Sequence, residues 1–70
     1  MRQTHFYALV NHEFGEERGD FILHHHLISG RNKTASELER EGVDLRDVWA
    51  GLCADFDVPP DRQFGPSDLV

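Results

Sequence analysis

Apolar residues recur at spacings of three and four along most of the chain, which is the period of an amphipathic helix. The first such stripe consists of Phe6, Leu9, Val10 and Phe14. It predicts a helix that Thr4 caps and that ends at Gly15, because glycine readily takes up a left-handed turn. Residues 16–28 predict a second helix, whose acidic first turn suits the helix dipole.

The third and fourth helices have clear start signals. Thr34 followed by Glu37 matches a capping box, and Gly42 ends this short third helix. Asp44 is placed to cap the fourth helix, which carries the longest apolar stripe of the chain. The stripe consists of Leu45, Val48, Trp49, Leu52, Cys53 and Phe56. The two prolines that begin at Pro59 end the helix.

No segment alternates with period two, so the pattern predicts an all-α fold, a compact single-domain bundle of about four short helices. Residues 1–62 form the predicted helical domain, and residues 63–70 form a short C-terminal tail. The third and fourth helices, near residues 34–56, are spaced like a helix-turn-helix pair. A chain of 70 residues without disulfides has a marginal core, so we expect tight packing or association with another chain.

Charge and composition narrow the classes of partner. The chain has 13 acidic and 7 basic residues, a net charge of −6, which disfavours binding to nucleic-acid phosphates and to anionic membranes. No apolar run is long enough to span a bilayer, and the N-terminus lacks the apolar region of a signal peptide. We therefore expect a cytoplasmic protein that does not associate with membranes.

The three consecutive histidines at positions 24–26 are an obvious candidate metal site. Consecutive helical residues diverge by about 100°, and only pairs three or four apart face each other. The run contains no such pair, and a single cysteine excludes a cysteine-based zinc cluster. A tertiary site that combines His12 with His25 stays open. We nevertheless expect neither a metal nor a cofactor.

Within the predicted second helix, His24 shares an arc with apolar side chains. The arc consists of Phe21, Leu23, Leu27 and Ile28. The arc predicts that His24 is the least exposed of the three histidines, with the other two more solvated.

Catalytic signatures are missing from the sequence. We find no paired carboxylates, glycine-rich phosphate loop or serine-triad motif, so the sequence predicts that the protein is not an enzyme. Cys53 lies inside the best apolar stripe and close to Asp55 and Asp57. A reactive thiol needs exposure and a positive environment, so we interpret Cys53 as a small core residue.

Small residues on the fourth helix indicate a candidate partner contact. Ala50, Gly51 and Ala54 lie outside the main stripe, together with Arg46, and would let another helix approach closely. The same positions are equally compatible with ordinary helix surface. The first functional hypothesis is accordingly a protein-interaction module or a small oligomer, with an unknown protein or a second copy as partner.

The alternative is a helix-turn-helix-like nucleic-acid-binding accessory protein. Gly42 and the apolar Leu38, Val43 and Val48 have the offsets of that motif, although Glu41 stands where a leucine is often found. The face that would read DNA offers one cation against two anions. It comprises Arg46, Asp47, Ala50, Gly51, Ala54 and Asp55. A basic stripe built from Arg2, Arg31, Lys33 and Arg46 would favour this alternative.

Several short motifs follow one another in order along nearly the whole chain. They are Met1-Arg2 with Thr4 and Phe6, Phe14-Gly15, a histidine-leucine step, Thr34, Gly42-Val43-Asp44, Val48-Trp49, Cys53, and Val58-Pro59 with Arg62. This series resembles the small actinobacterial proteins catalogued as domain of unknown function 3046. The chain departs from that pattern at Gln3, where the family usually carries an apolar residue. The resemblance implies an all-helical cytoplasmic protein of actinobacteria and supplies no activity.

Overall fold

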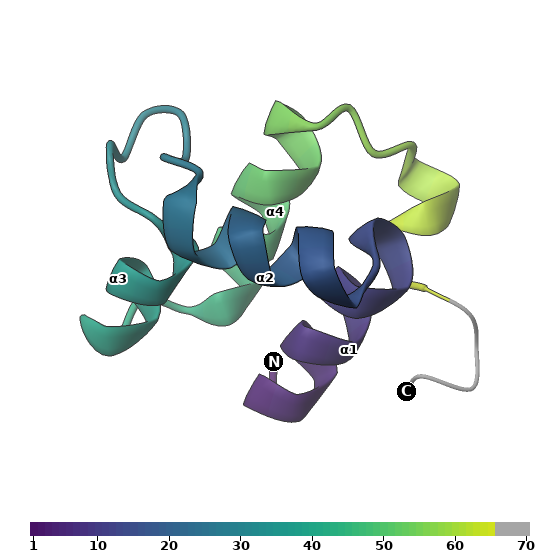
Figure 1. Ribbon diagram of the computed structural model, residues 1–70, viewed down its shortest axis with the longest axis horizontal. Helices are drawn as coiled ribbons and strands as arrows, with labels where there is room; N and C mark the ends of the chain where they lie inside the picture. Colours follow the sequence, from purple (N-terminus) through teal and green to yellow (C-terminus); the bar gives the residue numbers. More distant parts are fainter. Residues whose placement is uncertain (66–70) are drawn as a thin grey trace.

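Four α-helices and one short 3-10 helix follow one another along the chain in the computed structural model, which describes residues 1–65 (Figure 1). The helices are α1 (Gln3–Phe14), α2 (Glu16–His25), α3 (Ala35–Arg40), α4 (Leu45–Asp55) and η1 (Pro60–Arg62). Apart from one isolated bridge between Ile28 and Lys33, these residues form no β-structure. The predicted all-α fold of about four helices is confirmed. Of the predicted tail at residues 63–70, residues 66–70 lie outside the described part of the chain.

Helices α1 and α2 are joined by a single residue, Gly15. Its φ of +83° is accessible to glycine at little cost, and its N–H donates to the Asn11 carbonyl at 2.9 Å. The predicted cap at Thr4 is wrong, because Arg2 occupies the N-cap position and α1 begins at Gln3, two residues earlier than a cap at Thr4 requires. The Arg2 carbonyl already accepts the Phe6 N–H at 3.0 Å, so Thr4 lies within the first turn.

Helix α2 is shorter than predicted. His26 takes an extended backbone conformation, and the chain then turns back through a loop in which the Ile28 N–H donates to the Lys33 carbonyl at 2.9 Å. This turn carries Ile28 into the core, where it is 2% exposed, and leaves Leu27 56% exposed. Phe21, which was expected on the buried arc, is 63% exposed.

The start signals of the last two helices are confirmed. The Glu37 N–H donates to Thr34 Oγ1 at 3.2 Å, and the Thr34 N–H donates to Glu37 Oε1 at 3.0 Å, which completes the capping box. The same Thr34 N–H lowers the pKa of the Glu37 carboxyl. Asp44 caps α4, since its Oδ1 accepts the Arg46 N–H at 2.9 Å.

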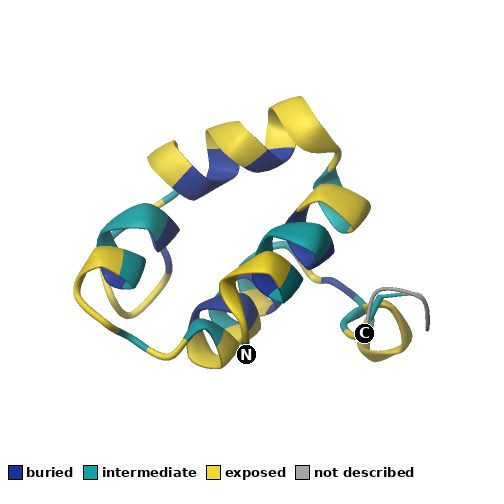
Figure 2. Ribbon diagram, turned by 90° about the horizontal axis from the view of Figure 1, so that it is seen from below, coloured by how far each residue is buried: buried dark blue, intermediate teal, exposed yellow. Residues whose placement is uncertain are grey.

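The core lies between the helices, whose buried residues face inward while exposed residues line the outside (Figure 2). The α4 stripe is confirmed as its centre: Val48, Trp49, Leu52 and Cys53 are buried, and Leu45 and Phe56 are partly buried. Every one of the first three helices contributes at least two buried residues. The four helices therefore share one hydrophobic core, and none of them is an appendage.

The start of the predicted tail is attached to this core. The Trp49 indole N–H donates to the Gln63 carbonyl at 2.7 Å, and the Gln63 amide donates to the Val58 carbonyl at 3.0 Å. Phe64, the next residue, is 78% exposed. Contact between the tail and the core is thus made by a backbone carbonyl and not by the aromatic side chain.

Candidate interaction surfaces

The order of burial within the histidine run is the reverse of the prediction. The His24 side chain is 54% exposed, and that of His26 is 28% exposed. The reason is the early end of α2: residue 26 turns toward α4, whereas His24 and His25 stay on the solvent side of the last helical turn. The expectation that His24 is the least exposed of the three is wrong.

His26 lies at the edge of the core and contacts two residues at the end of α4, Asp55 and Phe56. Its Nε2 lies 2.7 Å from Asp55 Oδ2, and its ring centroid is 4.7 Å from that of Phe56. The Ser29 backbone N–H donates to the same Asp55 oxygen at 3.0 Å. This N–H, followed by the His26 bond, lowers the pKa of the Asp55 carboxyl. These contacts fasten the loop after α2 to α4, and their partners are too far apart in sequence for local patterns to reveal them.

The candidate patch on α4 is only partly open. Ala50, Ala54 and Arg46 are exposed, as a contact surface requires. Gly51 is instead covered by the chain itself, because a Cβ placed there would lie 2.7 Å from Ile28 Cγ2. The missing side chain of Gly51 therefore makes room for Ile28, and the open surface consists of the three other residues.

We expect Gly51→Ala to destabilise the fold by about 1 kcal/mol. Overpacking costs about 1–3 kcal/mol, and the better helix propensity of alanine returns up to about 1 kcal/mol. In an Ile28→Leu background, which lacks the β-methyl group that the new Cβ would meet, the same change should stabilise the protein. Urea unfolding of the four proteins of this cycle measures the sign change. If Gly51→Ala stabilises the protein with either residue at position 28, Gly51 does not contact Ile28 and lies on an open surface.

The described residues contain no group of three or more histidine, cysteine, aspartate or glutamate side chains arranged to hold a metal ion. His12 and His25 are both exposed. The absence of metal binding stays a prediction: calorimetric titration of tag-free protein with Zn²⁺ should show no saturable site of micromolar affinity. A tight site that is lost in His25→Ala or His24→Ala would contradict it.

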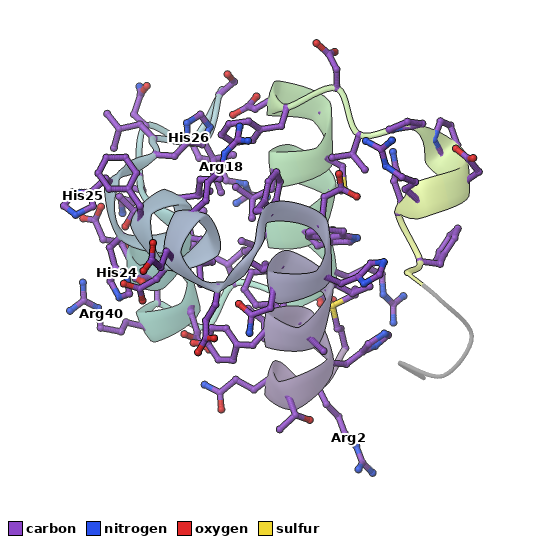
Figure 3. All side chains as sticks on the ribbon, turned by 45° about the vertical axis from the view of Figure 1, so that its right-hand side comes forward. Arg2, Arg18, His24, His25, His26 and Arg40 are labelled. Carbon is purple, nitrogen blue, oxygen red and sulfur yellow. The ribbon has the colours of Figure 1, made fainter. Side chains whose placement is uncertain are left out.

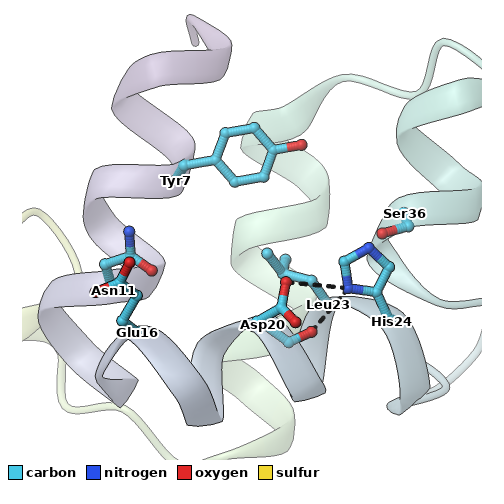
Figure 4. A pocket seen from close by; sticks show the side chains of 7 residues that line it. All are labelled: Tyr7, Asn11, Glu16, Asp20, Leu23, His24 and Ser36. Atoms are coloured by element: carbon cyan, nitrogen blue, oxygen red, sulfur yellow. Dashed lines mark hydrogen bonds and ion pairs between the residues drawn. The ribbon is translucent and has the colours of Figure 1, made fainter.

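A shallow groove lies between α1, α2 and α3 (Figure 4). It is lined by Tyr7, Asn11, Glu16, Asp20, Leu23, His24 and Ser36. His24 Nδ1 lies 2.8 Å from the Asp20 carbonyl oxygen and 3.5 Å from Asp20 Oδ1. The two side chains are 54% and 77% exposed, so solvent competes for both partners and weakens their coupling.

Tyr7, one of the residues that line this groove, also links two helices. Its hydroxyl donates to Glu39 Oε1 at 2.6 Å, and Gln3 Nε2 donates to the other oxygen of the same carboxylate at 2.5 Å. The Glu39 hydrogen bond, burial and the carboxylate charge raise the pKa of Tyr7 to about 12. Tyr7 therefore stays protonated at neutral pH and holds α1 against α3.

Cys53 is buried, as predicted. Burial, with a smaller contribution from the nearby Glu13 charge, raises the pKa of the Cys53 thiol to about 11. At neutral pH the nucleophilic thiolate form of Cys53 is therefore scarce, which supports the interpretation of Cys53 as a core residue.

The solvent face of α2 is the surface that sequence reasoning missed. Phe21 lies in the middle of this helix, and its ring stacks on that of His25 with centroids 4.6 Å apart. One turn earlier, the Arg18 guanidinium lies 5.9 Å from the centroid of the Phe14 ring. Aromatic residues are enriched in protein–protein interfaces relative to the rest of the surface, so the ring of Phe21 makes this face a candidate contact surface.

Several cations of the described residues are paired with acids or lie apart from one another. Lys33 is paired with Glu41 at 2.5 Å, and Arg62 with Glu13 at 3.1 Å. Arg2 lies far from His25 and Arg40 (Figure 3). On α4, Arg46 still faces solvent with Asp47 beside it.

No helix among residues 1–65 is long and apolar enough to cross a membrane. No curated protein and no solved structure matches this chain. One family model does match, that of the protein of unknown function DUF3046, and it covers residues 1–61. The match takes in all four α-helices of the common core and the motifs from Met1 to Pro59 that resembled this family. The chain therefore belongs to the DUF3046 family.

Proposed function

We propose that this protein is a cytoplasmic interaction module or small oligomer that binds a protein partner and catalyses no reaction. The observation that carries the proposal is the exposed aromatic ring of Phe21, which is 63% exposed at the centre of the solvent face of α2. Exposing such a ring is unfavourable in water by on the order of 1–3 kcal/mol, and covering it by a partner recovers that free energy.

The titratable groups support a role without catalysis. Active sites shift pKa values for chemistry, whereas each clearly shifted group here has a structural cause. Tyr7 is bonded to Glu39, Asp55 to the loop after α2 and Glu37 to Thr34 in the capping box, and Cys53 is packed in the core. The groove of Figure 4 is open and its histidine is solvated, so it offers no water-excluded site.

The α3–turn–α4 arrangement favours a second candidate, binding to nucleic acid. The two helices are joined by residues 41–44 with Gly42 at φ +83°, as in helix-turn-helix motifs. The charge argues against it, because Asp47 lies beside Arg46 on the exposed side of α4. Fluorescence anisotropy with a labelled DNA duplex at low salt tests this candidate, and salt-sensitive binding that Arg46→Ala weakens would favour it over a protein partner.

Affinity capture from an extract of the source organism tests the main proposal. The parent protein is compared with Phe21→Ser, with Ala54→Glu on α4, and with Phe64→Ser as a control for the loss of an exposed aromatic ring elsewhere. We expect one protein to be retained by the parent and the control, and lost from Phe21→Ser or Ala54→Glu. Equal retention by all four proteins, or none by the parent, would contradict the proposal.

A further inference from the structure

We propose that the solvent face of α2 binds the same face of a second copy of this chain, in an antiparallel pair related by a two-fold axis beside Phe21. This inference rests on the proposed function and names its partner. The face is defined by Glu17, Arg18, Phe21, His24 and His25, all of them exposed. We call it the α2 face.

The positions on the α2 face make it self-complementary. At about 100° and 1.5 Å per residue, Glu17 lies about 40° to one side of Phe21 and about 6 Å before it. His24 lies about 60° to the same side and about 4.5 Å after it. A two-fold axis that lies between the two faces and perpendicular to both helices reverses the helix direction. Residues on one lateral side of the first helix then lie next to residues on the same lateral side of the second. Each copy therefore places its Glu17 beside His24 of the other copy, and the two Phe21 rings meet at the centre.

The distribution of charge along the chain favours the same pairing. Residues 21–36 contain no aspartate or glutamate, although the whole chain has 13 of them. The acids of α2, which are Glu16, Glu17 and Asp20, all precede Phe21, whereas its histidines follow it. An antiparallel pair thus sets the acidic half of each α2 against the acid-free half of the other. A parallel pair would set acid against acid.

The other side of the α2 face limits the strength of this contact. Arg18 and His25 share that side, so each Arg18 lies beside His25 of the second copy and meets no opposite charge there. Within one chain the His25 ring already stacks on Phe21 with centroids 4.6 Å apart, so the aromatic surface at the centre is preformed. A helix of 10 residues is about 15 Å long and covers less than the roughly 800 Å² per partner of a standard interface. The dimer should therefore be weak and depend on concentration.

Sedimentation equilibrium between about 10 µM and 1 mM, the range of weak association, tests the proposal. Parent protein should pass from monomer to dimer. Phe21→Ser should raise the dissociation constant at least about tenfold, and Phe64→Ser, which removes an exposed ring outside the α2 face, should leave it unchanged. Circular dichroism confirms that each variant is folded. A monomer at every concentration, or a dimer that Phe21→Ser leaves intact, would overturn the proposal.

Exchange of Glu17 and His24 tests the orientation. Glu17→Lys alone sets a lysine beside His24, and His24→Glu alone sets two acids beside each other, so each should weaken the dimer. In the double variant a lysine meets a glutamate at both contacts. In an equimolar mixture of the two single variants a lysine meets a glutamate at one contact and Glu17 meets His24 at the other, so both should associate more tightly than either single variant. If neither does, the antiparallel pairing is wrong. A monomeric protein that still captures a partner in a Phe21-dependent way would refute the dimer and leave the proposed function standing.

Discussion

Trp49→Ala should lower the free energy of unfolding by about 3–5 kcal/mol, the range for removal of a large aromatic side chain from a core. Trp49 is 5% exposed, and the Phe14 ring packs edge-on against it with centroids 6.5 Å apart. Its indole N–H is also bonded to the Gln63 carbonyl. Small domains are stable by only about 5–15 kcal/mol, so this one change should remove much of the stability.

Urea unfolding followed by circular dichroism measures this effect. Trp49→Phe is the matched control, because it keeps an aromatic ring in the core and removes the N–H that Gln63 accepts. We expect the control to cost about 1–2 kcal/mol, the sum of a lost hydrogen bond and a modest loss of volume. A midpoint for Trp49→Ala close to that of the parent would show that the core lies elsewhere.

Asp55→Ala should cost about 1.5–3 kcal/mol near neutral pH, the range for hydrogen bonds to a charged group. The change removes the acceptor for both His26 and the Ser29 N–H, and with it the polar fastening between the loop after α2 and α4. Asp47→Ala is the control, since Asp47 is exposed in the first turn of the same helix and should cost only about 0.5 kcal/mol.

The effect of Asp55 should depend on pH in a defined direction. Its pKa is lower in the folded state than the value of about 3.9 in unfolded chains. Unfolding therefore takes up a proton in the interval between the two values, and the stability that Asp55 contributes is lost as the pH falls through the folded-state pKa. We expect the difference between parent and Asp55→Asn to shrink as the pH is lowered from about 5 to below 3. A difference that stays the same or grows would show that the carboxylate is not held by these bonds.

Local signals in the sequence determined much of the fold. The capping box of Thr34 and Glu37 and the cap at Asp44 involve residues two or three apart, so their geometry follows from helix formation alone. The same is true of the α4 stripe. Its apolar residues recur at helical spacing over the whole helix, so only one side of the helix can be buried in a core. The all-α class, the burial of Trp49 and Cys53 and the family resemblance were all accessible at this level.

The surface of α2 was decided by tertiary structure. Periodicity placed Phe21 and His24 on one apolar arc with Ile28, because it extended the helix through residue 28. The chain instead leaves the helix after His25, since Ile28 gains burial in the core and its loop is fastened by Asp55 from α4. The side of α2 that meets the core instead carries Ile22 and Leu23, of which only Leu23 belonged to the predicted arc.

Gly51 shows the same division on α4. Its sequence neighbours Ala50 and Ala54 predicted a patch of small residues, and both alanines do face solvent. The space beside Gly51 is occupied by the side chain of Ile28, which stands 23 residues earlier in the chain, so the local sequence around Gly51 does not reveal it. The sequence by itself determined where α3 and α4 begin and which stripe forms the core, because those are short-range preferences. Which side of α2 meets solvent, and which small residues remain open, depended on contacts between distant segments, which only the tertiary structure sets.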